Sequence, residues 1–257
     1  SLERYPMRRA LLLVVPIVVL NVVAYAAPVG NRHNFETAAA CDRDDTGHLS
    51  VGIDRYGTFG HSTQAGTSAE YNPANDAPDR GARQTVYQSM PFLCQSQGGA
   101  TAGTWLEQGV VDDNARADGQ PNRMTSAFTA HDIGVDMTVE LDCNVLTYCW
   151  TFTNRSNVRM DTVALIQYID GDLYYEGTFN NDFAASSVGV PRFIYEFDAG
   201  DDPQEPTTQL ALYGDDPDDR FLSGWEVGEY PESRDRIENT ANGCESLRNR
   251  IADEDGN

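Results

Sequence analysis

The chain contains no lysine: all 18 of its basic residues are arginines, and they stand against 40 aspartates and glutamates. The formal net charge is therefore -22. So acidic a surface repels nucleic acid and anionic lipid headgroups, which excludes both as partners apart from the membrane crossed during export. One explanation is a high-GC genome that avoids lysine codons, combined with an acidic or saline setting. The other is that some carboxylates hold divalent cations, and the two explanations are compatible.

Long helix-forming runs are missing after residue 30, and several catalytic signatures are missing throughout. Aromatic and β-branched residues alternate there with Gly, Asn, Asp and Pro, which favours an all-β class. The sequence has no His-Glu-x-x-His helix, no Gly-x-Ser-x-Gly turn, no phosphate-binding loop and no Cys/His spacing typical of zinc. No catalytic residue and no organic cofactor follows from such a sequence.

The first 26 residues have the three parts of a secretory signal. Met7 and two arginines precede the apolar stretch "ALLLVVPIVVLNVVAYAAP", which ends in the small-x-small triplet Ala24, Tyr25 and Ala26. The apolar run over residues 10 to 23 is shorter than the roughly 20 residues of a membrane-spanning helix, although a retained anchor is the alternative. We therefore expect export, with the protein secreted, extracellular or at the cell surface.

This assignment divides the chain in two. Residues 1–26 form the signal peptide, with residues 1–6 as an overrun of the reading frame, and residues 27–257 form a single secreted domain. The abrupt acidic end of that domain suggests truncation at its C-terminus.

Export places all five cysteines in an oxidising compartment: Cys41, Cys94, Cys143, Cys149 and Cys244. One or two disulfides are expected, each stabilising the fold by on the order of 2–4 kcal/mol, and a monomer keeps one thiol. The sequence leaves the connectivity open. A bond within or between the segments that hold Cys94, Cys143 and Cys149 is the pairing we expect.

Strand and turn signals predict an antiparallel β-sandwich or supersandwich with long loops and a short helical tail. Residues 61 to 83 read as a long loop, and the tail begins near Glu232. The clearest hairpin turns between Asp142 and Asn144. In its second strand, alternate side chains belong to opposite faces. One face holds Leu146, Tyr148, Trp150 and Phe152, and the other holds Thr147, Cys149, Thr151 and Thr153.

The segment "YCWTFTNRSNVRMDTVALIQYIDGDLYYEGTFNNDFA" resembles one found in secreted, uncharacterised β-sandwich surface proteins of high-GC bacteria. The shared pattern is a strand ending in Thr-Asn, a short turn, and a strand closing on an acidic residue with a second acidic residue nearby. The resemblance covers about fifty residues. It implies an extracellular β-sandwich, and it transfers no catalytic residue to this chain.

Two acidic segments are candidates for calcium binding, with solvated turns as the alternative. The first holds Asp42, Asp44 and Thr46 at alternate positions before Gly47, but the place of a bidentate glutamate is taken by Ile53. The second, "YIDGDLYYEGTFNNDF", offers four carboxylates near a Gly that lets the backbone turn: Asp170, Asp172, Glu176 and Asp182. An ion held in either place is expected to stabilise the fold and to take no part in chemistry.

The absence of a catalytic motif favours a non-enzymatic extracellular or cell-surface β-sandwich module, structural, adhesive or ligand-binding, with a glycan or another surface molecule as its partner. The alternative is a carbohydrate-binding module or a carbohydrate-active enzyme. Several aromatic residues are of a kind that stacks on sugar rings, although aromatics in strands more often belong to a core: Trp105, Tyr174, Tyr175, Trp225 and Tyr230. The sequence assigns no ligand and no oligomeric state.

Overall fold

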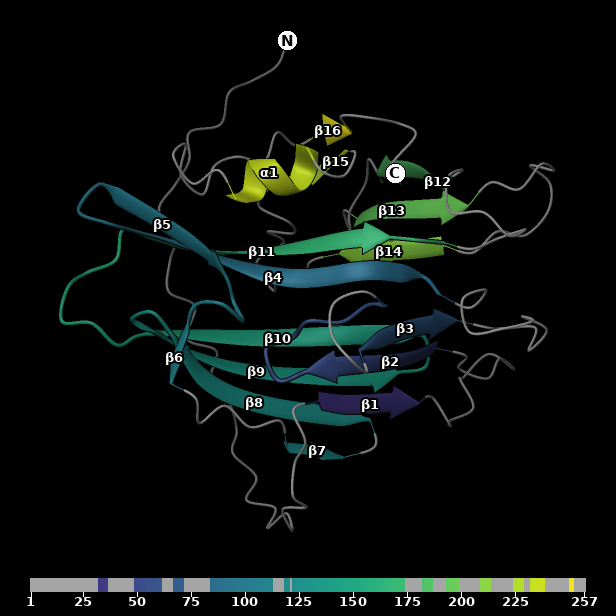
Figure 1. The fold of residues 1–257 in the computed structure, drawn as a ribbon, viewed down its shortest axis with the longest axis horizontal. Coiled ribbons are helices and arrows are strands. Elements are labelled where there is room, and N and C mark those ends of the chain that lie inside the picture. The colour runs from purple at the N-terminus through teal and green to yellow at the C-terminus, as the bar shows by residue number, and fades with distance from the viewer. Residues whose placement is uncertain are drawn as a thin grey trace.

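The computed structural model describes the backbone of the following residues: 32–36, 49–61, 67–71, 84–112, 118–120, 122–173, 182–186, 193–198, 209–213, 224–228, 232–238 and 250–251. These residues form mostly antiparallel sheets and one short helix, so the all-β prediction is confirmed (Figure 1). No helix among them is long and apolar enough to cross a bilayer.

The strands alternate with turns along the described chain, and the helix follows near its end. Their bounds are β1 (Arg32–Glu36), β2 (Leu49–Asp54), β3 (Ser68–Tyr71), β4 (Val86–Gln97), β5 (Ala100–Trp105), β6 (Val110–Asp112), β7 (Asp118–Gln120), β8 (Arg123–Ala130), β9 (Ile133–Asp142), β10 (Val145–Asn154), β11 (Thr162–Gly171), β12 (Asp182–Ser186), β13 (Phe193–Asp198), β14 (Gln209–Tyr213), β15 (Glu226–Val227), α1 (Glu232–Glu238) and β16 (Arg250–Ile251).

The first layer of the sandwich joins two three-stranded sheets, ordered β1-β2-β3 and β11-β4-β5. Isolated bridges from Phe59 to Ile53 and to Ser89 connect the two. The second layer has the order β10-β9-β8-β6, with β7 also paired to β8. A further antiparallel sheet, β12-β13-β14, and the parallel pair β15-β16 complete the described pairings.

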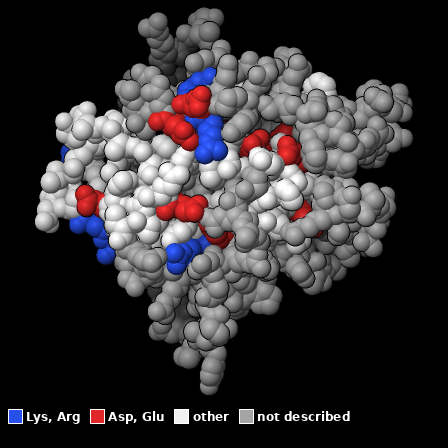
Figure 2. Space-filling model, viewed as in Figure 1, with Lys and Arg blue, Asp and Glu red and all other residues white. Residues whose placement is uncertain are grey.

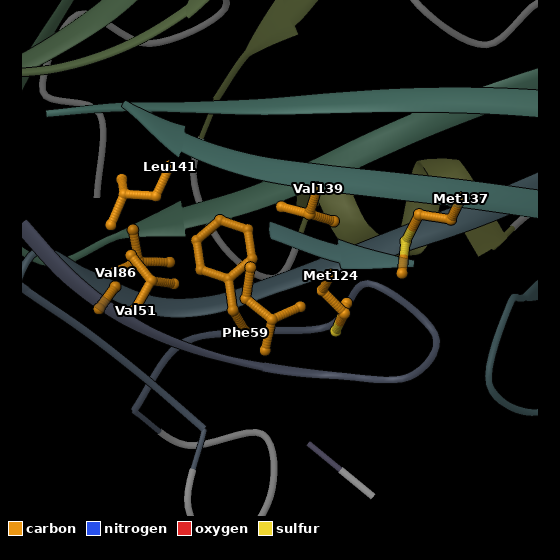
Figure 3. Close-up of a cluster of buried hydrophobic side chains, with 9 residues drawn as sticks. Val51, Phe59, Val86, Met124, Met137, Val139 and Leu141 are labelled. Atoms are coloured by element: carbon orange, nitrogen blue, oxygen red, sulfur yellow. The ribbon is translucent and has the colours of Figure 1, made fainter. Parts of the chain in front are cut away.

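Apolar side chains from the two layers meet in one core (Figure 3). The largest cluster combines first-layer residues, including Val51, Phe59 and Val86, with second-layer residues, including Met137 and Val139. A neighbouring cluster joins first-layer residues to second-layer residues in the same way, and its buried members are Tyr56, Leu93, Leu106, Phe128, Ala130, Ile133 and Val135. Because burial of apolar area drives folding, these contacts are what hold the layers face to face.

The opposite face of β4 and β11 is covered by α1. Phe92 and Cys94, which flank the inward-facing Leu93, pack there with Trp105, Tyr168 and other buried residues, including Ile237 of the helix. In Figure 1, β11 and β4 accordingly lie between α1 above and the strands β10, β9 and β8 below. The helix lies where a helical tail was predicted, and the residues from 239 to 249 lie outside the described part of the chain.

The β9–β10 hairpin turns at Cys143 and Asn144, as predicted, and its register is unbroken from Asp142↔Val145 to Ile133↔Asn154. Along β10, exposed and half-buried residues alternate. The face with Tyr148 and Trp150 packs on the core, and the opposite face is exposed, so the predicted facing of this strand is confirmed.

The prediction of one loop over residues 61 to 83 is wrong, because β3 lies inside that segment. The strand "SAEY" is short and polar, so its sequence carries little strand signal. It forms because β2 offers it a ladder in which Ala69 faces Val51, and Ala69 is buried there. β1 likewise pairs with β2 along its whole length, in a segment where no strand was predicted.

Three cysteines lie among the described residues. Cys94 and Cys143 are disulfide-bonded, whereas Cys149 is an exposed free thiol. A disulfide was expected within or between the segments that hold Cys94, Cys143 and Cys149, and Cys149 takes no part in one. The predictions for Cys41 and Cys244 lie outside the described residues.

Cys94 and Cys143 lie too far apart to bond to each other. Leu93 packs with Val135 near the start of β9, and Cys143 follows the far end of that strand, eight residues and roughly 26 Å beyond Val135. A disulfide needs Cα atoms within roughly 7 Å. We therefore expect two separate bridges and one reactive thiol per denatured, unreduced chain, measured by thiol titration and peptide mapping. Three thiols, or a peptide linking Cys94 to Cys143, would contradict this expectation.

Candidate functional site

Two of the predicted calcium ligands lie together at the end of β11. Asp170 pairs with Gln88 of β4, and the register shifts by a bulge between Asp170 and Gly171. Asp172 follows directly, and Gln84 Nε2 donates a hydrogen bond of 2.9 Å to its Oδ2. Both carboxylates are half-buried. We call Asp170, Asp172 and Gln84 the β11 acidic site.

Burial raises the pKa of both carboxyls in this site. The pKa of Asp170 rises to about 6, although a hydrogen bond with Tyr168 and the charge of Arg234 act in the opposite direction. The pKa of Asp172 also rises to about 6, through burial and then through the charge of Asp170, while the hydrogen bond from Gln84 lowers it. Two neighbouring carboxyls that titrate near neutrality can exchange protons or accept a cation.

A third carboxylate reaches this bulge from a sheet that is remote in sequence. Glu196 of β13 lies so close to Gly171 that a Cβ atom on Gly171 would overlap its carboxyl group. A larger residue at position 171 would therefore have to displace the Glu196 carboxyl group. The bulge in β11 thus serves as a contact between the sandwich and the β12-β13-β14 sheet.

On the other side, Arg234 ties the site to helix α1. Its guanidinium donates to Gln88 Oε1 at 3.0 Å and pairs with Glu238 Oε1, also at 3.0 Å. It also lies 5.4 Å from the centre of the Trp105 ring, and the Trp105 indole N–H donates to Glu238 at 2.7 Å. Through these contacts, the residues next to Asp170 help to hold α1 on the sheet.

The remaining predicted ligands are not brought to this site by any described contact. Asp42, Asp44, Thr46 and Glu176 lie outside the described residues, and only the backbone of Asp182 is described, at the start of β12. Within the described part of the chain, no group of three or more His, Cys, Asp or Glu side chains is placed to hold a metal ion. Calcium therefore stays a prediction, which the pair Asp170 and Asp172 allows us to test.

If calcium binds to this pair, millimolar calcium will raise the melting temperature more than sodium or magnesium at matched ionic strength. The stabilisation is about 2.7 kcal/mol when free calcium reaches 100 times its dissociation constant. Calorimetry in the three salts measures it, and Asp172→Asn should remove the calcium-specific part. Equal melting temperatures in all three salts would refute the prediction, because general screening acts through ionic strength alone.

Sequence reasoning missed Asp54, which is the most buried described carboxylate, with 2 % of its surface exposed. It ends β2, and its Oδ1 accepts the backbone N–H groups of Tyr56 and Thr58, at 2.8 Å each. Its buried Oδ2 has no hydrogen-bond partner among the described groups. The carboxyl thus holds the turn between β2 and Phe59 in shape.

Burial raises the pKa of Asp54 to about 7, the two backbone hydrogen bonds lower it, and the charge of Glu107 adds a smaller increase. The Asp54 charge contributes in turn to a pKa of Tyr148 well above its ordinary value, although burial is the larger cause there. Tyr148 donates to Gly57 O at 3.3 Å, so the turn lies directly against β10. Asp54 is a proton-binding group of the core, closed to a substrate.

Comparison with known proteins gave no match to a family model, to a curated protein or to a solved structure. The resemblance to secreted surface proteins of high-GC bacteria therefore stays an expectation.

The outer face of the β10-β9-β8 sheet is exposed and rich in small, uncharged side chains. Register places Cys149, Thr138 and Thr125 in one row across the three strands, and Thr151, Asp136 and Ala127 in the next. Arg123 and Glu140 form an ion pair of 3.1 Å at one end, and both are more than half exposed. Figure 2 shows that acidic and basic side chains also lie side by side elsewhere on the surface. We call these rows the threonine face.

The aromatic residues considered for sugar stacking do not form a described platform. Trp105 is 5 % exposed and packs edge-on against Phe92 and Tyr168, so it belongs to the core. Trp225 is half-buried. Tyr174, Tyr175 and Tyr230 lie outside the described residues.

Proposed function

We propose that the chain is an exported, non-enzymatic β-sandwich module that works at the cell surface or outside the cell by contact with another macromolecule. Its N-terminal segment supports export, and its layered, antiparallel fold supports the role of a rigid module. The threonine face carries the proposal. Hydroxyl and methyl groups in register offer hydrogen bonds and apolar contact without the strong charge of the rest of the chain.

A polysaccharide is the partner class that this chemistry fits best. Sugars present many hydroxyl groups, which can form hydrogen bonds with threonine hydroxyl groups and with the carboxylate of Asp136. Because the face spans three strands, it suits an extended polymer rather than a small molecule in a pocket. The acidic surface in turn disfavours polyanions.

The β11 acidic site supports a second candidate, a carbohydrate-active enzyme. Glycoside hydrolysis uses two carboxyl groups, one of them with a raised pKa so that it can donate a proton. Asp170 and Asp172 both have pKa values raised to about 6. The hydrogen bond from Gln84 to Asp172, and the bond from Arg234 to Gln88 beside Asp170, fit a structural role better than a catalytic role in an open cleft.

The two candidates separate when the purified full chain is screened against a panel of polysaccharides for binding and for release of reducing sugar. We expect binding without turnover, and a loss of at least tenfold in affinity on Thr125→Arg/Ala127→Arg, which places bulky charge on the threonine face. Thr101→Arg, on a different sheet, is the matched control. Turnover that disappears in Asp170→Asn/Asp172→Asn would show that the protein is an enzyme and contradict the non-enzymatic module. The absence of both binding and turnover on every polysaccharide would refute a polysaccharide partner.

A further inference from the structure

Strand β10 is the least protected of the described sheet edges. It is ten residues long, contains no charged residue, proline or glycine, and pairs with β9 without a register shift. Within the described part of the chain, β9 is its only strand partner. Natural edge strands are normally guarded by charge, proline, bulges or shortness, because free backbone groups invite another strand.

The other described edges are guarded or shorter, and β5, which is uncharged like β10, has only six residues and contains Gly103. β11 ends in Asp170 and a bulge, β6 is three residues long with a register shift, and β1 carries Arg32 and Glu36. β3, β12 and β14 are four or five residues long. Among the described strands, the long, unguarded edge of β10 is therefore the exception, and it is the edge best suited to pair with another strand.

Side chains on β10 are also incompletely covered. On β9, the inward-facing Met137, Val139 and Leu141 are at most 4 % exposed. Their partners across the hairpin, including Trp150 and Tyr148, are only half-buried, although they point to the same core. Tyr148, Trp150 and Phe152 form a stacked row along the strand, with ring centres 5.7 and 6.3 Å apart. A neighbouring strand would cover the exposed side of this row.

We propose that this edge pairs with the same edge of a second copy of the chain, antiparallel about a two-fold axis at Cys149. Two chains of net charge -22 repel each other, so a contact between two copies costs least along a strand that carries no charge, and β10 is such a strand. An antiparallel edge is also self-complementary, as a two-fold interface requires.

Backbone geometry agrees with this register. The two-residue turn makes its flanking residues, Asp142 and Val145, a hydrogen-bonded pair, and such pairs alternate along the hairpin. Cys149 therefore directs its backbone groups to β9, whereas Tyr148 and Trp150 direct theirs to the open edge. Tyr148 then exchanges hydrogen bonds with Trp150 of the second copy, and the two Cys149 residues face each other between those bonds.

The side chains match in the same register. On the inner face, Tyr148 meets Trp150 and Leu146 meets Phe152 of the second copy, which are aromatic and apolar pairs. On the outer face, Thr147 meets Thr151 and Val145 meets Thr153. Pairs of these kinds stabilise antiparallel strands by roughly 0.2–1 kcal/mol each, and the register brings no like charges together.

Sedimentation of the purified full chain, with reductant present, tests the pairing without relying on any ligand. We expect a species of twice the chain mass, kept in Cys149→Ser. Thr147→Lys/Thr151→Lys places like charges opposite each other twice, and should weaken the dimer on the order of tenfold. Within one chain the same lysines face Glu140 and Asp136, so folding is not opposed, and thermal melting checks this. Thr147→Lys/Thr151→Glu places opposite charges across the axis and should restore the dimer. Its glutamate faces Asp136 within the chain, so thermal melting checks the folding of this variant as well.

Cys149 also reports the register. Two facing Cα atoms in a non-hydrogen-bonded pair lie roughly 4.5 Å apart, within the range of a disulfide. With a small-molecule disulfide as oxidant, the two thiols lose two protons and two electrons, one bond forms between the copies, and the reagent is released as two thiols. We expect a covalent dimer from the wild type, none from Cys149→Ser and little from Thr147→Lys/Thr151→Lys. A wild type that stays monomeric, or a Lys/Glu variant that behaves like the Lys/Lys variant, would overturn the proposal.

Discussion

At pH 8, the Asp54→Asn variant is expected to be more stable than the wild type. At pH 5, it is expected to be equally stable or less stable. The folded-state pKa of Asp54, about 7, lies above its ordinary value of 3.8, so the folded chain binds this proton more tightly than the unfolded chain does. The stability contributed by the neutral carboxyl is therefore complete below pH 4 and is lost as the pH rises to 7. Between pH 5 and 8 the loss is about 3 kcal/mol, because each pH unit below the folded pKa corresponds to about 1.4 kcal/mol.

Asparagine keeps the acceptor that Tyr56 and Thr58 need but carries no charge. Its amide N–H group replaces the buried Oδ2, and an unmet buried donor costs about 1–3 kcal/mol at every pH. Denaturant unfolding of both proteins from pH 5 to 8 gives the difference directly. Asp170, Asp172 and the overall charge titrate in both proteins, so they cancel in the comparison.

Asp136→Asn is the matched control, since it removes one aspartate from the exposed face of β9. Parallel stability curves for the wild type and Asp54→Asn would mean that Asp54 does not bind a proton in the core near neutral pH.

Trp105→Ala is expected to destabilise the protein by about 3–5 kcal/mol, as is usual when a large buried aromatic side chain is removed. Trp105 contacts Phe92 and Tyr168 at ring distances of 5.0 and 5.9 Å. The same ring holds Arg234 above it and Glu238 at its N–H group, so the loss should also release α1 from the sheet. Denaturant unfolding measures the stability, and hydrogen exchange of residues 232 to 238 measures the docking of the helix.

Trp105→Phe separates packing from the hydrogen bond. It keeps an aromatic ring against Phe92 but loses the donor to Glu238, so we expect a smaller loss of stability and partial protection of the helix. If Trp105 were instead a sugar-stacking residue, Trp105→Ala would reduce polysaccharide binding and leave stability unchanged. That result would contradict its assignment to the core.

Local sequence was sufficient to predict a strand where one face of that strand is clearly apolar. β10 and its partner β9 were predicted together with their turn and the facing of each residue in β10, because the two-residue period and the turn residues act over a few positions. β1 and β3 were missed for the converse reason. Their short, polar sequences carry no such period, and they become strands only because β2 lies between them.

The candidate site was likewise predicted only in part from the sequence. The sequence placed Asp170 and Asp172 near the end of a strand, but it could not show that burial raises the pKa of both, or that Glu196 packs on Gly171 from another sheet. Asp54 was not among the residues that the sequence singled out, and the Asp-x-x-Gly spacing in "GIDRYG" was the available sign of its side-chain hydrogen bonds.

The sequence by itself determined the all-β class, the alternation of β10 and the acidic, lysine-free surface, because these depend on composition and on neighbours along the chain. Only the tertiary structure decided which described carboxylates are buried, which aromatics belong to the core and which of the described strands lie at a sheet edge. Desolvation and edge exposure depend on segments far apart in the sequence, such as β2 against β10 or α1 against β4, and no local pattern records which of them will meet.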